Sequence, residues 1–394
     1  MVKMQNKLQL SQQLTDIFNY LHSHPEASWQ EFETTKYLYT VLKKEGFNPQ
    51  LFPESTGLYV DIGNGKPYVG IRADIDALWQ EVDGQYRANH SCGHDGHMTV
   101  ALGVCFNLRE KLNSGAIRLI FQPAEEKGLG ALKVVQYGII DQLKYLFSLH
   151  VRPIQELADG YHSPALLHGA SRTYVGEITG IEAHAARPHL GINTIEVGAA
   201  IVQSLSAIKH DPTVPASIKL TRLQAGGEAA NVIPGRAVFS IDVRAQTNDM
   251  MAELSQQIEE RIYHVAESFK ATITMEKSAD IVAAVVSKEA QLIMEQAIIE
   301  VVGTAKLAMP IITPGGEDFH HYAVAYPHLK TTMLGLGCAV TPGLHHPHMT
   351  FNKDRLIEGV EILSKAALLA LKQIDFEEAV AHVGVSVGKG AQNN

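Results

Sequence analysis

The first 150 residues alternate between helical and strand-like hydrophobic patterns. Apolar residues recur every three or four positions through residues 6–45, with an interruption at HPEAS, and this spacing predicts two helices. Short runs rich in β-branched and aromatic residues then predict strands at 58–63, 68–76, 116–123 and 145–151, with helical patterns between them at 98–112 and 129–140. Strands that alternate with helices form βαβ units, so the pattern predicts a mainly parallel, mixed sheet flanked by helices, an α/β class.

A second set of elements begins near residue 172 and has a complete order of its own. Strand-like and helical patterns follow one another as β-α-β-β-α-β, at 172–180, 192–209, 217–226, 236–245, 249–269 and 271–277. This order is typical of a small ferredoxin-like α+β domain. Helical patterns at 288–303 and 354–374, with a strand at 331–337 between them, then resume the first arrangement. We therefore expect a discontinuous first domain, residues 1–171 plus 284–394, and an inserted domain, residues 172–283.

Composition narrows the class of protein. Of the 394 residues 45% are hydrophobic and 19% charged, which is ordinary for a globular protein. Asp and Glu outnumber Lys and Arg by 42 to 33, a formal charge of −9, and no long basic run appears, so neither nucleic acid nor membrane is expected as a partner. Three cysteines, no apolar leader and no run of 18 apolar residues lead us to expect a cytoplasmic protein.

Histidine is unusually frequent, with 19 residues, and it clusters with other metal-binding residue types. The clearest cluster is SCGHDGH, which holds Cys92, His94, Asp95 and His97 just before a predicted helix. A turn there can bring Cys92 and His94 to one metal ion, and the combination of thiolate and imidazole ligands suits zinc and neighbouring transition metals. The alternative is a loop whose polar side chains cap the next helix.

Two adjacent carboxylates, Glu125 and Glu126, directly follow the predicted strand in FQPAEE. Taken alone, such a pair fits an exposed, solvated loop. Other polar residues also stand at strand ends, however, with His150 on one strand and Asp74 and Asp76 on another. Ligands of open α/β sheets gather outside the carboxyl ends of the strands. These three strand ends and SCGHDGH, four placements in all, together predict a single crevice.

Histidines from two later segments are further candidates. GLHHPHMTFN holds His345, His346 and His348 and follows a predicted strand, so one of these side chains could reach the crevice. His184, in IEAHAARPH, ends a strand of the inserted domain, where an ordinary core or surface histidine is the competing interpretation.

Two adjacent glutamates beside a metal ion can have different roles. One coordinates the ion, while the other stays available to accept a proton from the water that the metal activates and to pass it to the leaving amine.

Taken together, these motifs resemble the aminoacylase and carboxypeptidase family of dinuclear metallopeptidases. The resemblance is to its amidohydrolase branch, which includes hippurate hydrolases, N-acyl-amino-acid amidohydrolases and plant hydrolases of indoleacetyl-amino acids. It extends over about residues 10–372 through HSHPEASWQEFET, IRADIDAL, SCGHDGHM, FQPAEE, SLHVRP, IEAHAARPHLGINTI, NVIPGRA with DVR, GGEDF and LHHPHMTFN.

The resemblance implies a zinc-peptidase-like catalytic domain with an inserted lid, which is commonly the dimerisation domain. It implies two divalent metal ions per chain, Zn or Mn with Ni or Co as alternatives, held by Cys92, His94, Glu126, His150 and His345. It further implies that Glu125 is the general base and that His184 stabilises the oxyanion, in its own site or in that of a partner subunit of a homodimer. The substrate-binding positions that it implies are Asn231, Arg244 and Glu317.

The chain departs from the wider family in two places. The sequence DVR around Arg244 differs from the small-residue context usual in this branch, and other branches have His-x-Asp where this chain has Arg72-Ala73-Asp74. Arginine does not act as a ligand, so the pair Cys92 and His94 has to supply the first metal.

We therefore expect a metal-dependent amidohydrolase that cleaves the amide bond of N-acyl amino acids or related amino-acid conjugates, small-molecule substrates. A metallo-carboxypeptidase or dipeptidase with the same catalytic core is the enzymatic alternative. A ligand-binding protein that kept the metal site and lost catalysis is the alternative from another class. The five potential ligands together with Glu125 favour an enzyme, because a binder has no use for the additional carboxylate.

Overall fold

The computed structural model describes residues 2–109, 111–112 and 115–389, which fall into two compact units. Unit 1 comprises the described residues up to Leu167, Val285–Ile311 and those from Asp318 onward. Unit 2 comprises His168–Ala284 and the short segment Ile312–Glu317. Among the described residues, no helix is both long and apolar enough to cross a membrane.

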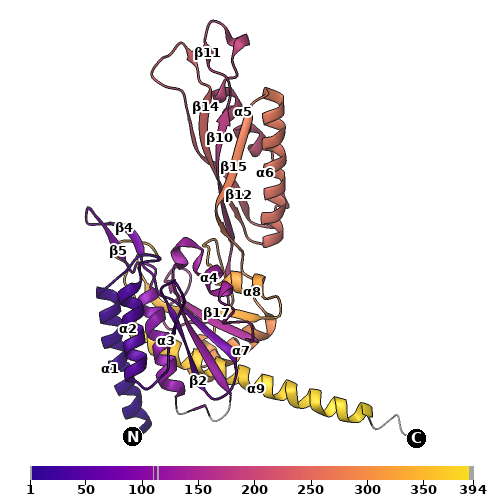
Figure 1. The fold of residues 1–394 in the computed structure, drawn as a ribbon. Coiled ribbons are helices and arrows are strands. Elements are labelled where there is room, and N and C mark those ends of the chain that lie inside the picture. Colours follow the sequence, from indigo (N-terminus) through magenta and orange to yellow (C-terminus); the bar gives the residue numbers. More distant parts are fainter. Residues whose placement is uncertain (1, 110, 113–114, 390–394) are drawn as a thin grey trace. The chain divides into compact units, whose positions relative to one another are not determined.

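Unit 1 is built on a seven-stranded mixed sheet with the order β1-β2-β6-β3-β7-β17-β8 (Figure 1). The four neighbours β6, β3, β7 and β17 are parallel. β2 pairs antiparallel with β6, β8 pairs antiparallel with β17, and β1 pairs antiparallel with β2. The strands are β1 (Gln50–Leu51), β2 (Leu58–Gly63), β3 (Pro67–Asp74), β6 (Ala116–Gln122), β7 (Tyr145–Pro153), β8 (His162–Ser163) and β17 (Lys330–Val340). Because four strands run in the same direction, their carboxyl ends meet at one edge of the sheet.

Successive side chains of the central strands enter two different hydrophobic cores. On β7, Phe147 and Leu149 belong to the core under one set of helices, whereas Leu146 belongs to the core on the opposite face. The first set comprises α1 (Val2–Ser23), α2 (Phe32–Lys44), α3 (His94–Leu108), α7 (Lys288–Val302) and α9 (Leu356–Lys389); the other face is covered by α4 (Gly130–Gln136) and α8 (His320–Ala325). Burial on both faces explains the near-continuous apolar runs of these strands, and this mixed sheet flanked by helices confirms the predicted α/β class.

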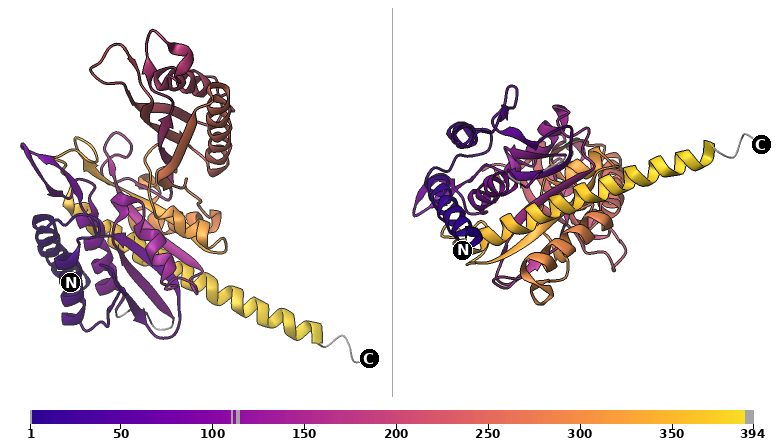
Figure 2. Two further views of the ribbon diagram at one scale, coloured as in Figure 1. Left: turned by 45° about the horizontal axis from the view of Figure 1, so that its top comes forward. Right: turned by 90° about the horizontal axis from the view of Figure 1, so that it is seen from below.

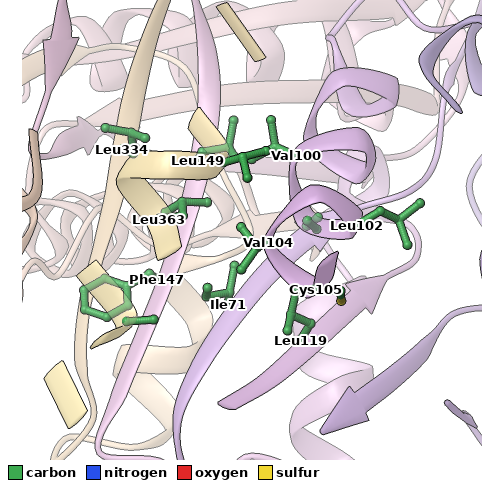
Figure 3. Close-up of a cluster of buried hydrophobic side chains, with 14 of the residues drawn as sticks. Ile71, Val100, Leu102, Val104, Cys105, Leu119, Phe147, Leu149, Leu334 and Leu363 are labelled. Atoms are coloured by element: carbon green, nitrogen blue, oxygen red, sulfur yellow. The ribbon is translucent and has the colours of Figure 1, made fainter. Parts of the chain in front are cut away.

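Helix α3 packs directly on the sheet (Figure 3). Its side chains Val100 and Val104 lie beside Leu149 and Ile71, and Leu363 of α9 packs into the same cluster. All five side chains are at most 2% exposed. This packing fixes the start of α3 at His94, and the loop with Cys92 just before it, relative to the strand ends.

Unit 2 is a four-stranded antiparallel sheet, order β12-β14-β10-β15, with two helices packed on one of its faces (Figure 1). Its elements are β10 (Ala170–Thr179), α5 (Thr194–Ser206), β12 (Ala216–Ala225), β14 (Arg236–Ala245), α6 (Asn248–Phe269) and β15 (Thr272–Ile281). The side chains of Asn193 and Thr247 accept hydrogen bonds from backbone N–H groups in the first turns of α5 and α6. These caps satisfy donors that a helix leaves unpaired and define where both helices begin.

Several elements were not evident from the hydrophobic pattern. The hairpin β4 (Leu78–Val82) and β5 (Gln85–Asn89) is largely exposed, so its sequence lacks a clear apolar face. Helix α3 starts at His94, four residues before the predicted start, because the polar residues of its first turn are buried against polar partners rather than solvated. Helix α9 continues past residue 374, the predicted end, to Lys389 and extends beyond the body of unit 1 (Figure 2). The remaining short strands are β9 (Leu166–His168), β11 (Ala183–His184), β13 (Val232–Ile233) and β16 (Ile311–Thr313).

A buried arginine ties the ends of the central strands together. Arg72 of β3 is 1% exposed, and its guanidinium donates to Asp74 Oδ2 at 2.7 Å and to Asp318 Oδ1 at 2.7 Å. The Nε–H donates to Gln122 Oε1 on β6, at 2.9 Å. Gln122 Nε2 in turn donates to both oxygens of the Asp318 carboxylate. Arg72 therefore offsets the charge of two carboxylates that lie out of contact with water.

Replacing Arg72 by methionine is expected to lower the free energy of unfolding of unit 1 by about 3–5 kcal/mol. The substitution keeps an apolar stem but leaves Asp74 and Asp318 buried without the guanidinium. Lys36→Met is the control, because Lys36 pairs with Glu33 on the surface and such exposed pairs contribute only about 0–1 kcal/mol. Denaturant unfolding of the three proteins measures both changes, and an Arg72→Met protein as stable as Lys36→Met would contradict the role given to Arg72.

Candidate metal centre

The six residues of unit 1 that the sequence analysis selected lie together at the carboxyl ends of the parallel strands. Their potential ligand atoms form groups within which every pair lies within 4.8 Å. One group is Cys92, His94 and His150, a second is Cys92, Glu126 and His345, and a third is His94, Glu125 and Glu126. Cys92, His94 and Glu126 each belong to two groups, so the three groups form one continuous cluster.

A left-handed glycine brings Cys92 and His94 to the same side of the loop. Gly93 has φ +87°, a backbone conformation that residues with a side chain rarely adopt. A Cβ atom at this position would also lie 2.5 Å from Val151 Cγ2 on β7. Only glycine therefore allows the loop to turn into α3 while it packs against the strand that carries His150.

His94 is oriented with one ring nitrogen bound and the other directed toward carboxylates. Its Nδ1–H donates to the Asp76 main-chain carbonyl at 2.9 Å, which leaves the lone pair of neutral imidazole on Nε2. Nε2 lies 3.9 Å from the nearest oxygens of both Glu125 and Glu126. Burial disfavours the charged imidazolium, but Asp74 and the other anionic groups around the ring outweigh it and raise the pKa of His94 well above its usual value. The surroundings of Nε2 thus favour positive charge.

The two glutamates stand on a short 3-10 turn, Glu125–Lys127, directly after β6. The Glu126 N–H donates to Asp76 Oδ2 at 3.0 Å, and Glu125 Oε1 accepts a hydrogen bond from the Asp318 N–H at 3.4 Å. Burial and the neighbouring Asp76 and Asp74 carboxylates, partly offset by His94, raise the pKa of Glu126 to about 7. Glu125 and Glu126 are adjacent but have different surroundings. Such a difference allows one carboxylate to bind a metal ion and the other to accept a proton.

His150 and His345 reach the cluster from β7 and from the loop after β17. The Nδ1–H of His150 donates to the Val151 carbonyl at 2.7 Å, so its Nε2 faces Cys92 Sγ at 3.5 Å. Burial, with the neighbouring His97 and Arg152, lowers the pKa of His150 well below its usual value and keeps the ring neutral, as a metal ligand must be. His345 has φ +65°, its N–H donates to the Ser91 carbonyl, and its Nε2 lies 3.8 Å from Glu126 Oε1.

His97 supports the cluster although the sequence analysis gave it no role. Val151 N–H donates to His97 Nε2 at 3.1 Å, so Nδ1 carries the hydrogen of the neutral ring and donates to Asp74 Oδ1 at 2.7 Å. Both ring nitrogens are therefore occupied, and His97 acts as a brace between β3 and β7 rather than as a ligand. His97 follows His94 by three residues on α3, so the two side chains lie on the same face of the helix, one turn apart. This spacing is visible in the motif SCGHDGH and could have indicated that His97 lies beside the site.

The cluster fits divalent metal ions. His94 Nε2 and Glu126 Oε1 are buried, and neither has a hydrogen-bond partner within the described part of the chain. Buried polar atoms in folded proteins are nearly always satisfied. Thiolate, imidazole and carboxylate donors within 4.8 Å of one another supply the ligand types that zinc and neighbouring transition metals prefer. A cation between these atoms would satisfy both orphaned groups.

The other four predicted site residues belong to unit 2. His184 and Asn231 are neighbours there, since β11 pairs with β13 and the Ala185 N–H donates to the Asn231 carbonyl. Arg244 lies exposed on β14, where its guanidinium donates to the Asp242 carboxylate at 3.0 Å. Glu317 is buried at the end of the segment Ile312–Glu317. Within unit 2, then, only His184 and Asn231 form a pair.

Comparison with known proteins places this geometry in a family. The family model described as "Peptidase family M20/M25/M40" matches residues 70–369. An N-acetyl-L-cysteine deacetylase of Bacillus subtilis is 33% identical over 379 residues, covering 91% of this chain and 88% of that protein. An IAA-amino acid hydrolase of Arabidopsis thaliana, ILR1-like 5, is 28% identical over 367 residues, 88% of this chain and 84% of its own.

A solved structure agrees with these matches. The YXEP protein of Bacillus subtilis, described as a dinuclear metal-binding peptidase of the M20 family, superimposes with a TM-score of 0.77. Its sequence is 25% identical, and the match covers 92% of this chain and 99% of that one. On the family model, the relatives and the fold, the chain belongs to peptidase family M20/M25/M40.

Proposed function

We propose that the protein hydrolyses the amide bond of N-acyl amino acids or related amino-acid conjugates, with Glu125 as the general base. The family membership already gives the general reaction: the chain is a metal-dependent hydrolase that acts on amide bonds. Two relatives are named for N-acetyl-L-cysteine deacetylation and for IAA-amino acid hydrolysis, and both names describe acylated amino acids. This shared chemistry supports the choice of substrate class.

The observation that carries the proposal is that the cluster has five candidate ligands, more than one structural metal ion needs, and a further carboxylate, Glu125, beside them. A structural zinc ion normally has its shell closed by four protein ligands. Here Cys92, His94, Glu126, His150 and His345 would hold two divalent ions, for which zinc or manganese is our first choice, and Glu125 lies beside them. When bound, such ions lower the pKa of a coordinated water and polarise the carbonyl that it attacks.

The side chains of the protein carry out proton transfer and substrate binding. Glu125 accepts a proton from the attacking water and delivers it to the nitrogen of the leaving amine, so the carboxylate is regenerated. The N–H of Asp318 holds one oxygen of Glu125 and thereby limits its rotation. Asn231, Arg244 and Glu317 are the residues that we propose bind the substrate, the arginine because its planar guanidinium suits a carboxylate.

The first test is amine release from a panel of N-acyl amino acids, with unblocked dipeptides in the same assay. Protein stripped of metal and reloaded with zinc or manganese should turn over the acylated substrates. Glu125→Gln should lower kcat by about 100- to 10,000-fold, because the amide keeps the size of the side chain and an oxygen for the Asp318 N–H but cannot take a proton. Its metal content should equal that of the wild type, whereas Glu126→Gln should lose metal.

Each result of this panel discriminates between functions. Turnover confined to dipeptides would replace the proposal by a dipeptidase or carboxypeptidase. Two tightly bound metals with no turnover of any substrate would favour a protein that only binds ligands. A Glu125→Gln variant as fast as the wild type would refute the role of Glu125 as general base.

We further propose that residues 172–283 form a lid and dimerisation domain whose His184 donates a hydrogen bond to the oxyanion. The Ala186 N–H donates to His184 Nδ1 at 3.0 Å, so in the neutral ring Nε2 carries the hydrogen and can donate it. The ring is exposed, as a group that must meet a substrate has to be. Donors of this kind contribute about 100- to 1,000-fold to kcat.

His184→Ala should therefore lower kcat by about 100- to 1,000-fold and leave KM within about threefold of wild type. Mixing inactive His184→Ala with inactive Glu125→Gln subunits distinguishes two arrangements. If His184 acts in the site of a partner subunit, mixed dimers contain one intact site and activity returns. If it acts in its own site, the mixture stays inactive, and a fully active His184→Ala protein would exclude both arrangements.

A further inference from the structure

The turn that carries Glu125 has an unusual backbone. Ala124, directly before it, has φ 53° and ψ 40°, the left-handed region that residues other than glycine seldom adopt. Its side chain is fully buried. Such a conformation persists only where the surroundings enforce it, so some contact has to hold Ala124 in place.

The contact is supplied by Glu31, a residue 93 positions earlier in the chain. Glu31 is 0% exposed, and its Oε1 accepts a hydrogen bond from the Ala124 N–H at 2.9 Å. Its Oε2 accepts another from the Thr56 hydroxyl at 2.6 Å. Both carboxylate oxygens are thus engaged, and the side chain has one defined orientation.

An ordinary helix-capping role does not account for Glu31. It stands at the position before α2, but its side chain makes no capping hydrogen bond. Glu26 serves that purpose instead, since its two oxygens accept from the N–H groups of Glu33 and Thr34, at 3.2 and 2.7 Å. The Glu31 carboxylate is directed away from its own helix and toward the glutamate turn.

The same N-terminal segment also reaches the other side of Glu125. Ser28 donates to Asp76 Oδ2 at 2.6 Å, and this oxygen accepts the Glu126 N–H at 3.0 Å. The residues before and after Glu125 therefore both have their N–H groups bound to buried carboxylates. Glu31 contacts one of them directly, and Ser28 contacts the other through Asp76.

We propose that Glu31 is a positioning residue for catalysis: it holds Ala124 in its left-handed conformation and so aims the Glu125 carboxylate at the reacting water. The inference rests on the proposed role of Glu125. In the part of the chain that the structure describes, the Glu31 carboxylate binds the Thr56 hydroxyl and the Ala124 N–H, so it reaches Glu125 through the backbone of the turn. Loss of this contact should lower kcat and leave KM nearly unchanged.

The test compares two substitutions of Glu31 with one of Glu26. Glu31→Ala should lower kcat by about 10- to 100-fold, with KM within about twofold, because misplacing a catalytic group by about 1 Å costs rate at this level. Glu31→Gln should stay within about threefold of wild type, since its amide oxygen can still accept the Ala124 N–H and its NH₂ can donate to Thr56. Glu26→Ala removes a cap from the same segment and should lower the melting temperature without lowering kcat.

Hydrogen–deuterium exchange gives a readout that does not depend on activity. The peptide that covers residues 119–128 should exchange faster in Glu31→Ala than in wild type, and Glu31→Gln should restore the protection. If Glu31→Ala does not fold, Glu31→Leu replaces it, because leucine fills the buried volume without offering an acceptor.

The two readouts separate failure of this inference from failure of the proposed function. A wild type with normal turnover, together with a Glu31→Ala variant of unchanged kcat and unchanged exchange, would overturn the inference and leave the function intact. A wild type without turnover would refute the function, while faster exchange in Glu31→Ala would still support the contact that holds Ala124.

Discussion

Carboxylates buried at the carboxyl ends of the parallel strands need cations, and this requirement organises unit 1. Arg72 meets it on one side, where its guanidinium binds Asp74 and Asp318. On the other side His94 faces Glu125 and Glu126. Unpaired charges out of contact with water are costly, so a positive charge among the glutamates would stabilise a site of this composition. Divalent ions would supply that charge, and their binding would then be coupled to folding stability.

The geometry of the cluster is set by hydrogen bonds between strands, since the ligands come from separate segments. Asp76 accepts the Glu126 N–H through its carboxylate and binds His94 through its main-chain carbonyl, so it aligns two candidate ligands. His97 joins Asp74 of β3 to the Val151 N–H of β7. These contacts hold the backbone at Glu126 and beside His150, and they orient the ring of His94. The precision of the site thus depends on residues that need not touch a metal or a substrate.

Much of this arrangement could be predicted from sequence, and the limit has a physical reason. Strand ends in a parallel sheet share an edge, so Glu125, Glu126 and His150 could be placed together from their positions after apolar runs. Contacts of Glu31 with Ala124 and of Arg72 with Asp318 join residues 93 and 246 positions apart, and no local pattern encodes them. The hairpin Leu78–Asn89 was missed because it is mostly exposed and therefore not apolar. The roles of His184, Asn231, Arg244 and Glu317 rest on the family resemblance and stay predictions.

Arg72 places a permanent positive charge beside the cluster, where it binds Asp74 and Asp318 and cannot itself act as a ligand. Cys92, in the loop before α3, is the candidate that would supply negative charge to an ion. Burial and the neighbouring Glu126 raise the pKa of Cys92 well above its usual value, so without metal its thiol is neutral. Burial disfavours the charged ring of His94, but Asp74 and the other groups around it raise its pKa well above the usual value, which favours the protonated form. Both residues must lose a proton before they can bind an ion. Metal occupancy should therefore weaken as pH falls, because protons and metal ions compete for the same two side chains.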